Sequence, residues 1–78
     1  MKQIYADKYR QIGLKIAYYR KLQGLTKEEL AEQVGLASAF IGHLEVPNIT
    51  KALSMDTLFD IVATLEVSPH KFLMFEDD

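Results

Sequence analysis

The chain has 78 residues, of which 49% are hydrophobic and 26% charged, which is the balance of an ordinary globular domain. Its net charge of −2 argues against a general polyanion binder, and no apolar run is long enough to span a membrane. The polar start is unlike a secretory signal, and the lack of cysteine excludes disulfides and fits a reduced, cytoplasmic setting. We expect one small domain over residues 1–78.

Charge is distributed unevenly along the chain. Residues 1–23 contain six Lys or Arg side chains against the single Asp7, whereas the remainder is acidic and ends in EDD. Such asymmetry can orient a protein on a charged partner, and it is equally typical of a solvated basic helix and a solvated acidic tail. Both interpretations remain open on the sequence alone.

The first predicted helix, over about residues 5–22, contains two apolar ladders. One side carries residues at helical spacing, namely Tyr5, Tyr9, Ile12, Ile16 and Tyr19. The opposite side carries a second ladder at i, i+4 and i+8, namely Leu14, Tyr18 and Leu22. A small domain cannot bury both faces of one helix by itself, so a later helix or another subunit must cover the second ladder. Gly24 is expected to end this helix.

A helix-turn-helix follows. Thr26 and Glu29 form a capping-box pair at the start of a helix over about residues 27–34, and Leu25 and Leu30 occupy its hydrophobic-staple positions. Gly35 is expected to end that helix and to allow the left-handed backbone of a tight turn. A third helix is expected near residues 38–45. Its usual Ser/Thr cap is Ala37, so Ser38 is a candidate N-cap that would shorten it.

The remaining elements are also helical. Residues 46–53 are expected to form a loop, and Ser54 is expected to cap a fourth helix over residues 55–65. Ser68 and Pro69 supply an N-cap and a first-turn proline for a fifth helix over about residues 69–75. The predicted fold is therefore all-α, with five helices and no strand.

The stretch "GLTKEELAEQVGL…FIGHLE" resembles the XRE-type, or phage repressor/Cro-like, helix-turn-helix family. The residues that match its pattern are Gly24, Leu25, Thr26, Leu30, Ala31, Gly35, Leu36, Ile41, Leu44 and Glu45, with Ile12, Gly13, Ile16 and Arg20 upstream. The resemblance covers about residues 10–75. It implies a lambda-repressor-like domain that binds DNA with its third helix in the major groove, and an ion pair between Arg20 and Glu45. The expected core comprises Leu30, Val34, Ile41, Leu44, Leu58, Ile61, Val62 and Leu65.

The resemblance also implies which residues contact DNA. The expected set is Thr26, Lys27, Ser38, Ala39, Gly42, His43, Asn48 and Lys51. Lys27 replaces the family's Gln, which lies against the DNA backbone, and so offers a charge to phosphate. Of the third-helix positions, Ser38 and His43 alone can hydrogen-bond a base, and Ala39 can only touch a thymine methyl. Each of these residues has a plainer interpretation as ordinary surface.

Gly42 has two interpretations. A glycine in the middle of a helix lowers helix stability by about 1 kcal/mol relative to alanine. Gly42 therefore either lets the backbone approach the duplex closely or is a product of drift without a functional role. The loop residues Asn48, Thr50 and Lys51 form a donor cluster that could hold the DNA backbone after the third helix.

The expected partners are double-stranded DNA and a second copy of the chain, with a protein partner as a further possibility. The apolar run Phe72 to Phe75 is either core or a two-fold dimer interface. The two histidines, His43 and His70, lack metal-ligand spacing, so no metal, cofactor or enzyme activity is expected. The leading hypothesis is a cytoplasmic, sequence-specific DNA-binding transcriptional regulator of the repressor type that acts as a homodimer. The alternative is an antitoxin-like or scaffold module on the same fold with weakened DNA reading.

Overall fold

The computed structural model describes residues 2–48 and 50–76 of the chain. A short 3-10 helix, η1 (Gln3–Tyr5), leads into the long helix α1 (Ala6–Leu22), which is followed by α2 (Lys27–Val34) and α3 (Ser38–Glu45). After a loop come α4 (Met55–Leu65) and a second 3-10 helix, η2 (Pro69–Phe72). No strand occurs in the described part of the chain, so the predicted all-α class is confirmed.

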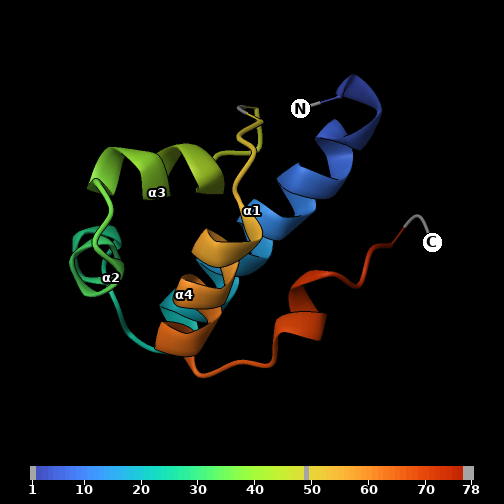
Figure 1. The fold of residues 1–78 in the computed structure, drawn as a ribbon. Helices are drawn as coiled ribbons and strands as arrows, with labels where there is room; N and C mark the ends of the chain where they lie inside the picture. Colours follow the sequence, from blue (N-terminus) through green and yellow to red (C-terminus); the bar gives the residue numbers. More distant parts are fainter. Residues whose placement is uncertain (1, 49, 77–78) are drawn as a thin grey trace.

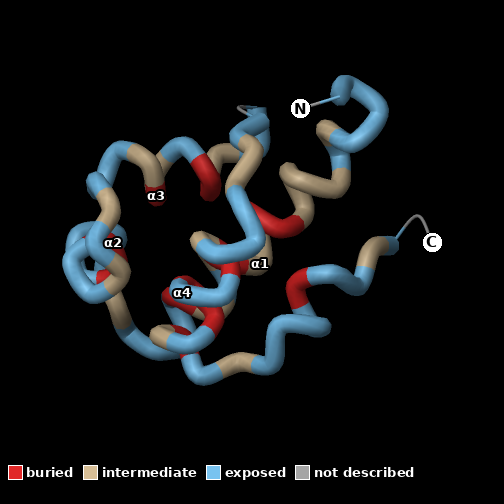
Figure 2. The backbone as a smooth tube through the Cα atoms, in the orientation of Figure 1, coloured by how far each residue is buried: buried red, intermediate tan, exposed pale blue. Residues whose placement is uncertain are grey.

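The elements surround one core (Figures 1 and 2). α4 lies along α1, α2 and α3 lie together at one side, and the C-terminal segment returns beside α1. The buried hydrophobic residues are Ile12, Ile16, Leu30, Ala31, Ile41, Leu44, Leu58, Ile61, Val62, Leu65 and Phe72. The expected core is confirmed except at Val34, which is only half-buried and packs against the edge of this cluster.

Both predicted glycine turns are present. Gly24 follows α1 with φ +73°, and the N–H of Leu25 reaches back to the carbonyl of Arg20 at 3.1 Å. Gly35 ends α2 with φ +72°, and the N–H of Leu36 reaches the carbonyl of Ala31 at 2.9 Å. This is the Schellman arrangement, which satisfies the last carbonyls of a helix and turns the chain sharply. The two turns set the directions in which α2 and α3 leave their predecessors.

The predicted fifth α-helix is wrong. The segment forms only the four-residue 3-10 helix η2. Its backbone hydrogen bonds run from the N–H of Lys71 to the carbonyl of Ser68 and from the N–H of Leu73 to the carbonyl of His70. The Ser68 side chain makes no capping hydrogen bond. A run this short forms too few i→i+4 bonds to offset the entropy of ordering it, so the burial of Phe72 sets its conformation instead.

The second ladder of α1 remains largely uncovered. Leu14 is half-buried, whereas Tyr18 and Leu22 are 58% and 66% exposed, so no later helix of the described chain packs over them. Tyr5 departs from the first ladder as well, because it caps the start of α1 and is exposed. The predicted burial of the first ladder is therefore confirmed for Ile12 and Ile16, whereas Tyr9 and Tyr19 are half-buried at the edge of the core.

Within the described residues, no helix combines the length and the hydrophobicity needed to cross a membrane.

Candidate nucleic-acid interface

The N-terminus of α2 is closed by the predicted capping box. The Thr26 hydroxyl accepts a hydrogen bond from the N–H of Glu29 at 3.0 Å, and the Glu29 carboxylate accepts one from the N–H of Thr26 at 2.8 Å. Lys27 is the first helical residue and is fully exposed. The remaining free N–H groups and the helix dipole favour an anion at this end of α2, and the Lys27 ammonium adds a full charge beside them.

α3 carries its apolar and polar residues on opposite sides. Ile41 and Leu44 are buried, and Phe40 is half-buried at the edge of the core. The residues expected to meet the bases lie together on the outer side, namely Ser38, Ala39 and His43, which are exposed, and Gly42, which is half-buried. Among the described residues, no hydrogen bond or ion pair engages the side chain of Ser38 or His43. This side of α3 is therefore available to a ligand.

The start of α3 differs from one expectation. Ala37 occupies the N-cap position with extended backbone and no side-chain hydrogen bond, and Ser38 is the first helical residue. The candidate capping role of Ser38 is therefore wrong, and α3 keeps its full predicted length. The reason is geometric, because a residue with helical backbone angles cannot place its side-chain oxygen against the N–H groups of its own first turn as an N-cap does. The Ser38 hydroxyl is left free for an outside contact.

Gly42 faces open space. A Cβ atom built on Gly42 would meet no heavy atom within 4 Å. The absence of a side chain there is not required by packing within the described molecule, which keeps both sequence interpretations of this residue open.

The loop after α3 places a cation beside that helix. The Lys51 ammonium lies 5.6 Å from the centre of the Phe40 ring, and Asn48, Thr50 and Lys51 are all exposed. This cation–π contact connects the loop to α3 across the end of the helix. Phe40 thus places a loop cation beside α3, a role that the sequence alone does not indicate because it depends on where Lys51 lies in the fold.

A buried ion pair fixes α3 against α1. The Arg20 guanidinium donates to both carboxylate oxygens of Glu45, at 2.7 and 2.8 Å, and to the carbonyl of Leu25 at 2.7 Å. Both side chains are buried, and the hydrogen bonds to Glu45 raise the pKa of Arg20. The predicted pairing is confirmed. The residues are structural, since neither reaches the outer side of α3.

Gly13 marks a close contact between α1 and α3 that sequence reasoning did not explain. A Cβ atom at Gly13 would lie 1.7 Å from the carbonyl oxygen of Leu44, so α1 touches the backbone of α3 at this point. Together with the Arg20–Glu45 pair, this contact holds α3 rigidly against α1.

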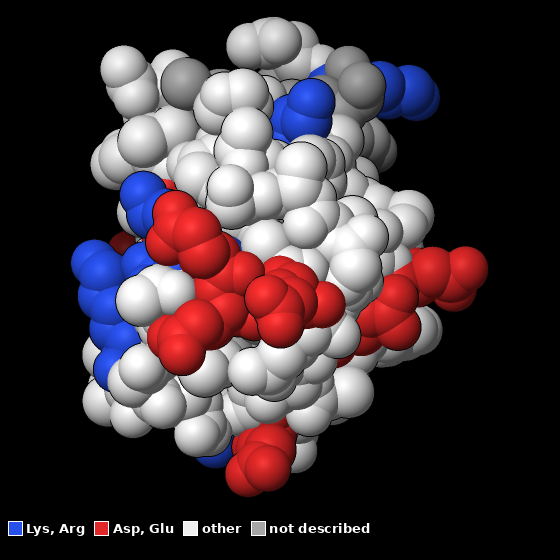
Figure 3. Space-filling model, turned by 90° about the vertical axis from the view of Figure 1, so that its left-hand side faces the viewer, with Lys and Arg blue, Asp and Glu red and all other residues white. Residues whose placement is uncertain are grey.

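Charge on this side of the molecule is segregated. The side on which α2 and α3 lie in Figure 1 faces the viewer in Figure 3, where acidic groups gather across the middle below a mostly uncharged upper part. α2 exposes Glu28, Glu29 and Glu32. A polyanion that approaches the outer side of α3 would be repelled by this acidic surface and attracted by Lys27 and Lys51. The charges therefore restrict how a duplex can lie on α3.

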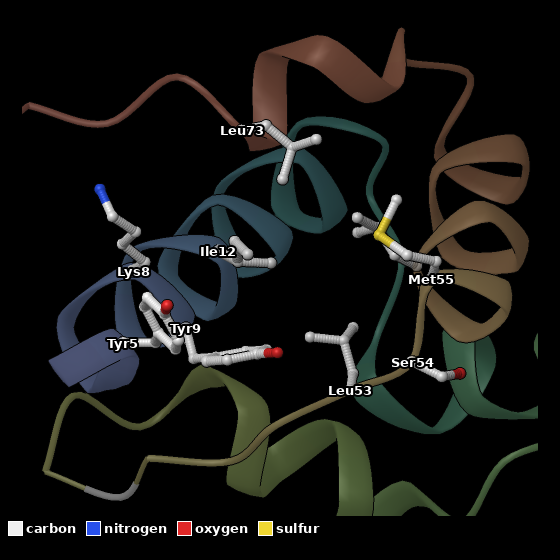
Figure 4. Close-up of a pocket in the computed structure, with 9 residues that line it drawn as sticks. Tyr5, Lys8, Tyr9, Ile12, Leu53, Ser54, Met55 and Leu73 are labelled. Atoms are coloured by element: carbon white, nitrogen blue, oxygen red, sulfur yellow. The ribbon is translucent and has the colours of Figure 1, made fainter. Parts of the chain in front are cut away.

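A separate apolar hollow of about 420 Å³ lies between α1, the start of α4 and the C-terminal segment. Figure 4 shows Tyr9 and Leu53 at one side of it, Met55 at another and Leu73 above. Phe72 does not take part, because it is fully buried against the core and the Tyr19 ring. Phe75 is half-buried and packs against the core, whereas Leu73 and Met74 are 42% and 62% exposed. Within the predicted run, these two exposed residues are therefore the candidates for a dimer interface.

Among residues 2–48 and 50–76, no three His, Cys, Asp or Glu side chains gather closely enough to hold a metal ion.

Comparisons with known proteins agree with this geometry. A helix-turn-helix family profile matches residues 16–72. The chain is 36% identical over 67 residues to the HTH-type transcriptional regulator SinR of Bacillus licheniformis, covering 86% of this chain and 60% of the relative. The chain therefore spans less than two thirds of that relative's length.

Two solved structures are similar in fold. The crystal structure of SinR, described as the master regulator for biofilm formation, in complex with DNA has a TM-score of 0.74 at 36% identity, covering 81% of this chain and 98% of that one. The SinR protein/SinI protein complex has a TM-score of 0.71 at 37% identity, covering 80% of this chain and 59% of that one.

Proposed function

The chain belongs to the XRE-type helix-turn-helix family, and from that premise we propose that it is a sequence-specific, DNA-binding transcriptional regulator. It binds duplex DNA as a homodimer, with α3 in the major groove, and represses transcription. Residues 1–78 act as one domain without enzyme activity, in the cytoplasm.

One arrangement carries the proposal: the outer side of α3 is uncovered, and a cation lies at each end of the helix-turn-helix. Lys27 stands at the N-terminus of α2, and Lys51 is held beside Phe40 at α3. Phosphate contacts from two such points fix the register of a recognition helix on the duplex. SinR, which has a similar fold, has been crystallised with DNA, and that supports the same use of this fold here.

Base reading is divided unequally among the proposed site residues. His43 is the one large polar side chain on the outer side of α3, and Ser38 is the one small polar group. Ala39 and Gly42 offer only a methyl group and bare backbone. Thr26 and Asn48 contribute hydrogen bonds to the DNA backbone. Much of the specificity then comes from DNA shape and from the spacing of two half-sites.

The proposed dimer uses the exposed apolar residues around the 420 Å³ hollow. Leu73 and Met55 line this hollow. Met74 follows Leu73 in the sequence, Phe59 lies one helical turn after Met55 in α4, and both are exposed. Burial of these side chains in a two-fold interface would remove their apolar surface from water. The two copies of α3 would then present paired reading surfaces.

Selection of bound sequences from a random duplex pool, followed by affinity measurements over a range of salt concentrations, tests the proposal. We expect the logarithm of the binding constant to fall with the logarithm of salt concentration with a slope steeper than about −4, as several phosphate contacts require. Lys27→Ala should weaken binding to all sequences about equally and make the slope shallower by about 1, whereas His43→Ala should change the preference among sequences.

Three outcomes would contradict parts of this proposal. Absence of binding to any duplex at low salt would exclude the DNA function and favour the alternative of a protein-interaction module. Equal, sequence-independent losses for Lys27→Ala and His43→Ala would assign His43 to phosphate alone. Glu32→Ala on the exposed side of α2 is the matched control, and it should leave sequence preference unchanged.

A further inference from the structure

The uncovered second ladder of α1 forms a continuous apolar seam. Leu14, Tyr18 and Leu22 lie one helical turn apart, so the seam is about 12 Å long. Tyr18 and Leu22 are 58% and 66% exposed, and because they lie one turn apart on the same face they form a contiguous apolar patch rather than scattered single residues. A hollow of about 190 Å³ opens beside the first two residues of the seam, lined by Arg10, Gln11, Leu14, Lys15, Tyr18 and Glu76.

The seam has a preset aromatic anchor. The Tyr18 ring stands edge-on to the Tyr19 ring, with centroids 5.0 Å apart and an interplanar angle of 81°. Tyr19 in turn packs on the buried Phe72 at 5.2 Å. Tyr18 is therefore held by a chain of rings that reaches the core, and an anchor of this kind loses little conformational freedom when a partner covers it.

Cations flank the seam on both sides. At 100° per residue, Lys21 projects about 60° to one side of its centre line and Lys15 about 60° to the other. Lys21 is exposed, and the Lys15 ammonium donates to the Met74 carbonyl while keeping its charge. At the N-terminal end Arg10 is neutralised by Asp7, whose pKa its hydrogen bonds lower. Glu76 lines the hollow beside Leu14 and Tyr18 and offsets part of the Lys15 charge, so the positive field is strongest toward Leu22, beside Lys21.

The seam faces away from α3. α1 buries Ile12, Gly13, Ile16 and Arg20, and Gly13 touches the α3 backbone, whereas the seam lies about 180° around the helix. A molecule bound along the seam would leave the outer side of α3 open. The same duplex cannot use both surfaces of this small molecule.

We propose that this seam is a docking site for an amphipathic helix of another protein, with an apolar stripe at i, i+4 spacing flanked by Asp and Glu. The apolar stripe would cover Tyr18 and Leu22, and the acidic flanks would face Lys15 and Lys21. A second copy of this chain fits poorly, because a two-fold axis would bring the basic flanks of the two copies together. The proposal does not depend on the proposed DNA function.

Three synthetic peptides test the proposal against the full chain by fluorescence anisotropy. The first has a helical Leu seam flanked by Glu, the second has the same seam flanked by Lys, and the third has the composition of the first with its Leu residues moved off one face. We expect the Glu-flanked peptide to bind at least about tenfold more tightly than either other peptide. Leu22→Ser should weaken its binding by about tenfold, which is the loss expected for one buried leucine.

Charge exchange provides the sharper test. Lys21→Glu should weaken binding of the Glu-flanked peptide by several-fold and strengthen binding of the Lys-flanked peptide, because the charge on this side of the seam changes sign. Ile4→Ser is the matched control: Ile4 is 77% exposed in η1, ten residues before the seam begins, and its replacement should not change peptide binding.

Absence of binding by the Glu-flanked peptide, or equal binding of the Glu- and Lys-flanked peptides, would overturn the proposal. So would Leu22-dependent binding to vesicles of phosphatidylserine and phosphatidylcholine that displaces the peptide, because it would identify a lipid surface as the occupant. Leu22→Ser and Lys21→Glu should keep their far-ultraviolet circular dichroism spectra and thermal midpoints. DNA affinity of Leu22→Ser should be unchanged, which separates a failure here from a failure of the DNA proposal.

Discussion

Arg20 and Glu45 show how a single buried pair can decide whether the helix-turn-helix is held in place. Each charge is stable in the core only because the other, together with the Leu25 carbonyl, satisfies it. Replacement of the pair by apolar residues could be neutral, but removal of one partner leaves a buried charge without compensation. The pair therefore makes the attachment of α3 to α1 sensitive to single substitutions.

Glu45→Ala should lower the free energy of unfolding by about 3–5 kcal/mol, because it strands the Arg20 guanidinium in the core. Urea denaturation followed by circular dichroism measures the change. Glu32→Ala, on an exposed turn of α2, is the control and should change stability by less than about 0.5 kcal/mol. A loss below about 1 kcal/mol for Glu45→Ala would mean that water reaches Arg20 when its partner is removed.

Gly42→Ala tests the unusual glycine of α3. Since no atom lies within 4 Å of the added Cβ, we expect the substitution to stabilise the chain by about 1 kcal/mol, the helix-propensity difference. We expect DNA affinity to fall despite this gain, because the methyl group would hold the duplex away from the α3 backbone. Urea denaturation measures the stability and a DNA titration measures the affinity of the same variant. An unchanged affinity would instead mean that this glycine has no role in binding and arose by drift.

At the scale of the helices, the molecule depends on a close crossing of α1 and α3. Gly13 is buried against the carbonyl of Leu44, and any larger residue must push the two helices apart. The crossing and the Arg20–Glu45 pair lie on the same side of α1, so they define the position of α3 together. Geometry at the outer side of α3 therefore depends on Gly13, a residue in the interior of the fold.

Gly13→Ala should lower stability by about 3 kcal/mol or more, because its Cβ would overlap a backbone oxygen that cannot rotate away. Gly42→Ala is the matched control, since both glycines lie inside helices and differ in the space around them. Thermal and urea unfolding of the two variants should give shifts of opposite sign. A stable Gly13→Ala variant would show that α1 and α3 can separate at low cost.

At the end of α4, introducing a glycine is expected to increase stability. Glu66 adopts the left-handed conformation, with φ 60°, at a position where Gly24 and Gly35 serve the other helices. Glu66→Gly removes the Cβ strain and should stabilise the chain by about 0.5 kcal/mol, after allowance for the greater flexibility of the unfolded chain. Ala63→Gly, in the same helix with ordinary helical geometry, should instead destabilise it by about 1 kcal/mol in the same denaturation experiment.

Local signals made the helices predictable from the sequence. The capping box at Thr26, the Ser54 cap and the turns at Gly24 and Gly35 all involve residues a few positions apart, so spacing alone indicated them. The features that escaped prediction are set by contacts between distant segments. η2 is shaped by the burial of Phe72, and the need for Gly13 is visible only when Leu44 is placed against it.

At the scale of the whole molecule, three surfaces can be distinguished: the outer side of α3, the hollow bordered by Leu73, and the seam of α1. The last two adjoin where Lys15 donates to the Met74 carbonyl. The sequence suggested which residues to propose as DNA contacts. It could not say which apolar residues stay exposed, because exposure depends on which elements pack together. The structure assigns Phe72 to the core and leaves Leu73 and Met74 at the surface. We therefore expect a substitution near the hollow to change the solution mass while leaving the outer side of α3 unaltered.

Leu73→Asp should convert a dimer to a monomer, because a carboxylate cannot be buried without a partner in an apolar interface. Sedimentation equilibrium measures the mass, and binding to duplexes with one or two half-sites measures the functional result. The variant should lose its preference for paired half-sites. Leu22→Asp is the control and should keep the dimer mass; a monomeric mass for the unchanged chain would exclude the proposed dimer.

The sparse outer side of α3 has a consequence for protein engineering. Ser38, Ala39, Gly42 and His43 make no side-chain contacts that the fold requires, while the opposite side of the same helix is anchored by Ile41, Leu44 and Glu45. New side chains can therefore be installed at Ser38, Ala39 and His43 without repacking the interior, while Gly42 is left unchanged because a side chain there would stand between the α3 backbone and a bound duplex. Arginine, asparagine or glutamine introduced there would find a stable, nearly blank scaffold on which to build a chosen base preference.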